Sequence, residues 1–168
     1  MCDQGAAAGA PFRYDGRMRR SADYGDRYGS WALVAGASEG LGEAFAEELA
    51  GRGLNLLLVA RREQVLRGVA DRLQRAHDVE VRTVSGDLGR PATIQSILEA
   101  TAELELGLVV YNAAYAPLGS LASIAPEAIE QAITVNALSP TRLVQALLPR
   151  LQGGGPGGQG DSRRRAGI

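Results

Sequence analysis

The sequence predicts an α/β fold in which parallel strands alternate with helices. Short apolar runs at 31–35, 54–60 and 108–112 are typical of buried strands, residues 79–84 are expected to form a further strand, and stretches of helical spacing lie between them. The intervening helices, of about 10 to 15 residues, are long enough for the right-handed crossovers that join parallel strands. A glycine-rich turn follows the first strand directly. Together these observations favour a doubly wound parallel sheet.

The first strand–helix unit begins at Trp31, where an apolar run of five residues ends in glycine. From residue 41 the spacing becomes helical, because Leu41, Phe45 and Leu49 recur every four residues. This periodicity predicts that these three side chains form the buried face of the helix. Glycines at 51 and 53 indicate its C-terminal end.

The same alternation continues along the chain. The second strand ends at two arginines, and a helix then runs to about His77, which we interpret as a solvated residue at the helix end. Pro91 and Pro126 suit the first turns of two further helices, and another helix is expected from about Pro140 to Leu151. The predicted organisation is a flexible lead-in (1–29), one domain (30–151) and a flexible tail rich in glycine and arginine (152–168).

The composition excludes several classes of function. The net charge is −1, so no general attraction to nucleic acid is expected, and the short run of arginines at 163–165 does not change this. No apolar run approaches the ~18 residues of a membrane span. Cys2 is the only cysteine, which excludes an internal disulfide and favours a cytoplasmic protein. Since the single histidine has no cysteine or histidine partner, no metal site is expected.

The turn after the first strand predicts a seat for the pyrophosphate of a nicotinamide-type dinucleotide. Glycines serve where the backbone turns tightly, approaches a phosphate, or packs a helix start against a strand. A phosphate placed there meets free N–H groups and the positive end of the helix dipole. The spacing is Gly-x-x-x-Gly-x-Gly, and a purely structural turn is the alternative. The candidate residues of this turn are Gly36, Ser38, Gly40, Leu41 and Gly42.

The end of the second strand favours NADP over NAD. An acidic residue there would bind the ribose 2′-hydroxyl of NAD, whereas an arginine accommodates the 2′-phosphate of NADP. Here Ala60 is followed by Arg61 and Arg62, of which Arg61 is the better candidate. The alternative is that both arginines only begin a solvated helix. Glu39 opposes the NADP reading, because a nearby carboxylate would repel the extra phosphate.

Taken in order, the motifs resemble the cofactor-binding, N-terminal half of the short-chain dehydrogenase/reductase family, from about 31 to 151. That family has a Rossmann-type fold, and the resemblance implies four strands in the order 3-2-1-4. It implies that Asp87 and Leu88 contact the adenine, and that the loop Asn112, Ala113 and Ala114 lies at the cofactor. Asn136 matches a catalytic asparagine that orders a proton-relay water. Residues 31–42 are also similar to NADP-using ketone reductases acting on steroids or long acyl chains.

The family transfers hydride between a nicotinamide and a carbonyl or alcohol, using Ser and Tyr-x-x-x-Lys besides the asparagine. The chain has no lysine, because all 18 basic residues are arginines. Tyr115 is read as a loop aromatic, since Gly119 stands where the lysine would be needed. A tyrosine with an ordinary pKa near ~10 is a poor base without a neighbouring cation. We therefore expect the cofactor-binding half of an oxidoreductase that is inactive alone, Asn136 being its one remaining catalytic position.

The composition changes abruptly after Leu151, and we interpret the glycine-rich segment as a truncated or wrong-frame ending. The loss of a fifth strand would leave 108–111 as an apolar sheet edge, so self-association is expected. Two alternatives to an enzyme half stay open: a non-catalytic dinucleotide-binding or regulatory module, and a truncated product without function. The resemblance implies a small carbonyl or alcohol compound as the substrate, and the sequence does not identify which one.

Overall fold

The computed structural model describes residues 24–25 and 28–153, and within them four parallel strands form one sheet in the order β3-β2-β1-β4. The predicted fold class and strand order are therefore confirmed. The strands are β1 (Trp31–Ala35), β2 (Asn55–Ala60), β3 (Val81–Ser85) and β4 (Leu106–Tyr111). The helical elements are α2 (Gly40–Gly51), α3 (Glu63–His77), α4 (Pro91–Ala100), α5 (Pro126–Ile133), η1 (Thr134–Leu138) and α6 (Ser139–Gly153).

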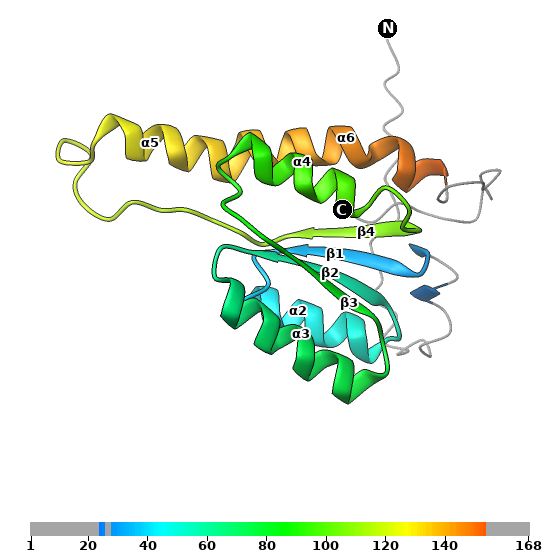
Figure 1. Cartoon of the computed structure of the whole chain (residues 1–168). Helices are drawn as coiled ribbons and strands as arrows, with labels where there is room; N and C mark the ends of the chain where they lie inside the picture. The colour runs from blue at the N-terminus through cyan, green and yellow to red at the C-terminus, as the bar shows by residue number, and fades with distance from the viewer. Residues whose placement is uncertain (1–23, 26–27, 154–168) are drawn as a thin grey trace, which may run out of the picture.

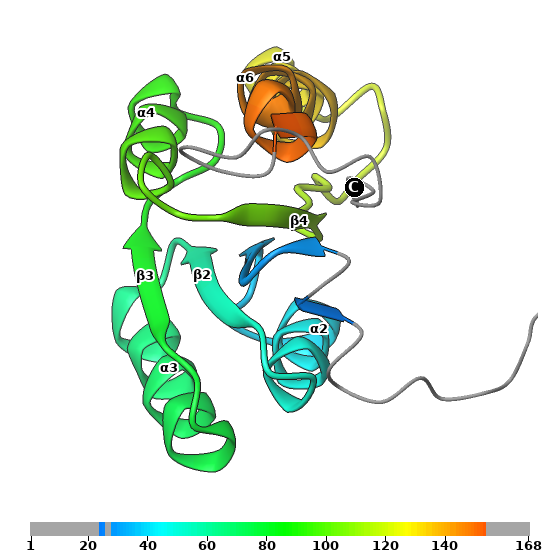
Figure 2. The ribbon, with the colours of Figure 1, turned by 90° about the vertical axis from the view of Figure 1, so that its right-hand side faces the viewer.

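Helices cover both faces of the sheet. α2 and α3 lie on one face, α4 and α6 lie on the other, and α5 continues the line of α6 (Figures 1 and 2). Because successive side chains of a strand point to opposite faces, Ala32 and Val34 join one core, whereas Leu33 and Ala35 join the other. Both faces of β1 are buried, which explains its uninterrupted apolar sequence.

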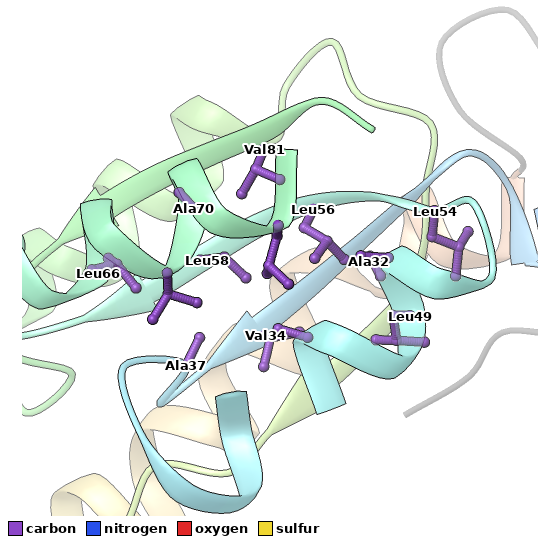
Figure 3. Close-up of a cluster of buried hydrophobic side chains, with 14 of the residues drawn as sticks. Ala32, Val34, Ala37, Leu49, Leu54, Leu56, Leu58, Leu66, Ala70 and Val81 are labelled. Atoms are coloured by element: carbon purple, nitrogen blue, oxygen red, sulfur yellow. The ribbon is translucent and has the colours of Figure 1, made fainter. Parts of the chain in front are cut away.

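The core beneath α2 and α3 is built mainly from aliphatic side chains of the two central strands and the two helices. Figure 3 shows Leu56 and Leu58 of β2 among Leu49 of α2 and Leu66 of α3. The opposite core places Leu143 and Leu147 of α6 against the sheet. These two cores fix the strands, so the carboxyl ends of β1, β2 and β4 meet at one edge of the sheet.

The buried face of α2 differs from the prediction. Leu49 is buried as expected, but Leu41 is 71% exposed and Phe45 47% exposed. The inward stripe consists instead of Gly42, Ala46, Leu49 and Ala50. The physical reason is close packing at the helix start, where a Cβ on Gly42 would stand 2.0 Å from the carbonyl oxygen of Gly36. Small residues must face the sheet there, so the two large side chains point away from it.

The two helices expected after Pro126 form one continuous rod. α5 passes into α6 through η1, a π-helical segment in which the N–H of Ser139 bonds to the carbonyl of Thr134. A π segment inserts one residue into the helix and often lies at functional sites. Pro140 lies within this rod, just after η1, and as a proline it has no N–H to donate to the preceding turn.

The expected lead-in 1–29 and tail 152–168 lie almost wholly outside the described residues, as do Cys2 and the arginines at 163–165. Among the helices of the described part, none has the length and apolarity needed to cross a membrane.

Candidate functional site

The turn that leaves β1 passes directly beneath the loop that leaves β4. Gly36 donates its N–H to the carbonyl of Val59 over 2.8 Å and has φ +87°, a conformation that favours glycine. A Cβ at Gly36 would stand 2.7 Å from the backbone nitrogen of Ala113. The sequence at this turn is thus dictated by the close approach of two strand ends, as well as by any ligand.

The start of α2 provides backbone donors at the same place. Its N-cap residue, Glu39, makes no side-chain hydrogen bond to the first turn of the helix. The first N–H groups of a helix have no partner within the helix, so they are available to an anion. Gly40, Leu41 and Gly42 form this first turn, which begins immediately after the turn at Gly36.

A cavity of about 300 Å³ opens between these segments, at the carboxyl ends of β1, β2 and β4. It brings together eight of the residues predicted from the sequence: Gly36, Ser38, Arg61, Asp87, Leu88, Asn112, Ala113 and Ala114. Its volume lies at the lower end of the range for small-molecule sites, about 300 to 1,000 Å³. The other predicted residues, Gly40, Leu41, Gly42, Arg62 and Asn136, do not line it.

Some lining residues were not predicted as site residues from the sequence. Gly86 follows β3, Gln131 belongs to α5 and Val135 belongs to η1. Gln131 and Val135 join the cavity only because the continuous rod of α5, η1 and α6 passes over the strand ends. Their proximity to Asn136 in the sequence is the one signal that could have indicated them.

The two arginines after β2 have different surroundings. Arg61 lines the cavity, and within the described part of the chain it forms no salt bridge. Arg62 forms a salt bridge with Glu39, with 2.7 Å between Nη2 and Oε2. Glu39, like Arg61, lines the cavity. The carboxylate expected to oppose a phosphate is therefore paired with a cation.

The loop after β3 is held by local hydrogen bonds. The Oδ1 atom of Asp87 accepts the N–H of Gly89 over 2.9 Å, which is an Asx-type turn. The carbonyl of Leu88 accepts the buried hydroxyl of Ser139 over 2.6 Å. The Asp87 turn and the start of α6 thus hold each other in place at the cavity.

Asn136 is exposed and clamps the loop that follows β4. Its Oδ1 accepts the N–H of Tyr115 over 2.8 Å, and its Nδ2 donates to the carbonyl of Tyr115 over 2.8 Å. A side-chain amide is the group that can give and take both bonds at once. The structure thereby joins η1 to Tyr115, a loop residue that lines the cavity.

Tyr111, the last residue of β4, also bonds to η1. Its hydroxyl donates to the carbonyl of Val135 over 2.7 Å. Burial, followed by the negative charge of Asp87, raises the pKa of Tyr111 to about 12. This tyrosine is therefore a structural donor and a poor general base at neutral pH.

Among the described residues, no group of three His, Cys, Asp or Glu side chains is placed to hold a metal ion. His77 is not simply solvated, as the sequence suggested. Its Nε2 lies 2.5 Å from Oε1 of Glu47, because α2 and α3 pack side by side. Glu47 also pairs with Arg72. The hydrogen bond with His77, followed by the hydrogen bond with Arg72, lowers the pKa of the Glu47 carboxyl.

The sequence matches a known family over most of its length. The family described as short chain dehydrogenase matches residues 30–159. A 7beta-hydroxysteroid dehydrogenase of Collinsella aerofaciens is 33% identical over 114 residues, which are 68% of this chain and 43% of that protein. The human protein named inactive hydroxysteroid dehydrogenase-like protein 1 is 33% identical over 136 residues, which are 79% of this chain and 41% of that protein. The chain therefore spans less than half the length of these curated relatives.

Solved structures show the same likeness. A short-chain dehydrogenase from Sphingobium yanoikuyae, solved with NADPH, has a TM-score of 0.70 and 37% identity, covering 74% of this chain and 50% of that chain. A structure reported for the stereoselectivity of a 7beta-hydroxysteroid dehydrogenase has a TM-score of 0.72 and 30% identity, with the same coverage.

Proposed function

The chain belongs to the short chain dehydrogenase family, and on that premise we propose that residues 30–151 form the NADP(H)-binding part of an oxidoreductase. When bound, the nicotinamide supplies or accepts the hydride that interconverts a carbonyl compound and an alcohol. The observation that carries the proposal is the cavity at the strand ends, which gathers the glycine turn, Arg61, Asp87 and Asn112. Ligands of doubly wound sheets bind in this crevice.

The residues present fit such a cofactor. The pyrophosphate would meet the uncapped first turn of α2, which lies against the turn at Gly36. Arg61 would hold the 2′-phosphate with its planar guanidinium. Asp87 and Leu88 would contact the adenine, and the loop from Asn112 to Ala114 would line the path of the nicotinamide ribose. Apart from the first turn of α2, these roles extend the family's pattern to residues that line one cavity.

Direct titration tests the cofactor proposal. We expect NADPH to bind more tightly than NADH when each is followed by calorimetry and by nicotinamide fluorescence. The Arg61→Gln variant should lose most of that difference, because NADH has no 2′-phosphate to lose. Arg67→Gln removes the same charge from an exposed salt bridge with Glu63 outside the cavity, so it is the matched control. Absence of binding for both cofactors would contradict the proposal.

We propose further that this chain binds cofactor without turning over substrate by itself. The family's tyrosine depends on a lysine ammonium, and this chain has no lysine. Asn136 is the one catalytic position of the family that the chain retains, and its side chain is engaged with the backbone of Tyr115. Relatives named hydroxysteroid dehydrogenases support a steroid ketone as the first substrate to assay. Robust reduction of such a ketone with NADPH would overturn this proposal.

A non-catalytic dinucleotide-binding or regulatory module is the second candidate. The observation that favours it is the likeness to proteins named inactive hydroxysteroid dehydrogenase-like protein 1. In that case NADPH would change the stability or assembly of the chain without any reaction. Thermal unfolding and sedimentation with and without NADPH would separate this role from simple loss of function.

Self-association of the chain is a related proposal. Among the described strands β4 has a partner on one side only, and its sequence from 106 to 111 is almost wholly apolar. An apolar edge of this kind can pair with another chain. Sedimentation should detect oligomers at micromolar concentration, and a persistent monomer would contradict the proposal.

A further inference from the structure

We infer that Arg62 sets the cofactor preference indirectly, by pairing with Glu39 so that Arg61 alone determines the charge that a 2′-phosphate meets. This inference rests on the proposed binding of NADP(H). It assigns different tasks to two neighbouring arginines that the sequence alone treats as equivalent. Arg61 is then the contact residue, and Arg62 is a positioning residue.

The geometry supports this division. Glu39 is the N-cap residue of α2 and Arg62 is the N-cap residue of α3, and the preceding strands β1 and β2 are direct neighbours in the sheet. The backbone therefore holds the two residues at the same edge, where their side chains meet at 2.7 Å. Glu39 and Arg61 line the cavity, whereas Arg62 does not.

The Arg62–Glu39 pair is too exposed to contribute much to the free energy of folding. The side chains of Arg62 and Glu39 are 53% and 74% exposed. Exposed ion pairs contribute little to folding because water and salt screen them. We expect a larger effect of the pair on a ligand, because Glu39 and Arg61 line one cavity and both charges act on a phosphate bound there.

The local charge shows what the Arg62–Glu39 pair achieves. Arg62 lies outside the cavity lining and pairs with the Glu39 carboxylate, so its charge acts on Glu39, and the charge that a 2′-phosphate meets in the cavity is mainly that of Arg61. Without Arg62, the charges of Glu39 and Arg61 cancel, and the freed carboxylate repels the phosphate. That carboxylate could instead accept hydrogen bonds from the ribose hydroxyls of NADH, the role that an acidic residue has in NAD-binding sites of this fold.

A double-mutant cycle in the full chain separates this indirect role from direct contact. We expect Arg62→Gln to weaken NADPH binding by about tenfold, the effect of roughly one unit charge at close range near a protein surface. NADH binding should stay the same or become tighter. Glu39→Gln should leave NADPH bound at least as tightly, and adding Arg62→Gln to Glu39→Gln should then have little further effect.

Two results would overturn the inference. If Arg62→Gln weakens NADPH equally with Glu39 present and with Glu39 replaced, Arg62 contacts the phosphate directly. If Arg62→Gln has no greater effect than the control Arg67→Gln, the Arg62–Glu39 pair has no role in binding. Arg67 is a fair control because it also forms an exposed salt bridge on α3, with 2.5 Å between its Nη2 and Oε1 of Glu63.

A readout without cofactor keeps the inference testable if the proposed function fails. Absence of binding for both dinucleotides in the unmodified chain would reject the proposed function. NMR of the Arg62 guanidinium would still report the salt bridge, because ion pairing slows rotation about its Cζ–Nε bond. Slow rotation that is lost in Glu39→Gln would support the Arg62–Glu39 pair, and fast rotation in both proteins would overturn it.

Discussion

The hydroxyl of Tyr111 donates a hydrogen bond of 2.7 Å to the carbonyl oxygen of Val135. This bond supplies a donor to a carbonyl that has no partner in the register of the helix. In η1 the N–H of Ser139 bonds to Thr134, so in the same register Val135 would pair with the nitrogen of residue 140. Residue 140 is proline and has no N–H to give. The end of β4 thus satisfies a carbonyl that the helix leaves open.

Replacement of Tyr111 by phenylalanine should destabilise the fold by about 1 kcal/mol, since it removes this donor and leaves the carbonyl without it. Urea unfolding measures the change. Tyr115→Phe is the matched control, because Tyr115 meets Asn136 through its backbone atoms only. Equal stability of Tyr111→Phe and the unmodified chain would contradict the role of the bond.

The ionisation of Tyr111 should make the fold less stable in alkali. Its pKa is raised to about 12 in the folded protein, against ~10 for an unfolded tyrosine. The unfolded chain therefore loses this proton first, and the free energy of unfolding should fall between about pH 10 and 12. Ultraviolet absorbance of tyrosinate and urea unfolding would follow the two effects. The Tyr111→Phe variant should lack both the late-titrating tyrosine and its share of the decline.

Adding a methyl group at Gly42 should strongly destabilise the domain. A Cβ there would stand 2.0 Å from the carbonyl oxygen of Gly36, so the backbone itself must move, and we expect a loss of roughly 3 kcal/mol. Gly68 is the contrasting site, because it is an exposed helix residue where an added Cβ would meet no atom within 4 Å beyond its chain neighbours and the nearby backbone of its own helix. Gly68→Ala should stabilise the fold by about 0.5–1 kcal/mol. Similar thermal shifts for both variants would show that this packing is not as described.

Asn136→Asp tests the clamp on the loop after β4. Aspartate can still accept the N–H of Tyr115, but it cannot donate to the carbonyl of Tyr115, and its charge faces that oxygen. We expect faster hydrogen exchange at the Tyr115 amide, with unchanged exchange in β1 and β2. Exchange that stays slow at Tyr115 would mean that other contacts hold the loop.

Acid should weaken the contact between α2 and α3. The pKa of Glu47 is lowered from 4.5 by the hydrogen bonds from His77 and Arg72. A carboxyl with a lowered pKa stabilises the fold above its ordinary pKa, and this contribution is lost as the pH falls through the folded value. Glu47→Gln should therefore show a smaller loss of stability below about pH 4.5 in unfolding experiments. An identical acid profile would rule out this carboxyl as a source of the loss.

Much of the fold could be predicted because strands β1 and β2 are buried on both faces of the sheet, and such strands have almost continuously apolar sequences. The limits of β1 were predicted without error, and the strand order follows from the family resemblance. The face of α2 could not be predicted from spacing alone. Leu41 and Phe45 have the right period, but close packing at Gly42 requires small residues toward the sheet. The continuous rod was missed because Pro126 and Pro140 both suggest helix starts, and only the tertiary fold shows that one helix passes through both.

The candidate site was predictable to a similar extent. Eight predicted residues line one cavity. They follow the strands directly in the sequence, and the carboxyl ends of parallel strands meet at one edge of the sheet. Their binding roles stay a prediction. Residues such as Gln131 could not be found, since their place depends on how a distant helix crosses the strand ends. The pairing of Arg62 with Glu39 is likewise a contact between two helix starts that no local pattern encodes.

The π segment at Thr134–Leu138 also determines which side chains of the long helix face the cavity and which face the sheet. One inserted residue turns every later side chain by about 100° around the helix axis. Upstream of the insertion the rod contributes Gln131 to the cavity wall, and downstream it buries Leu143 and Leu147 against the sheet. Without the inserted residue, a regular α-helix could not both place Gln131 in the cavity lining and bury Leu143 and Leu147 against the sheet.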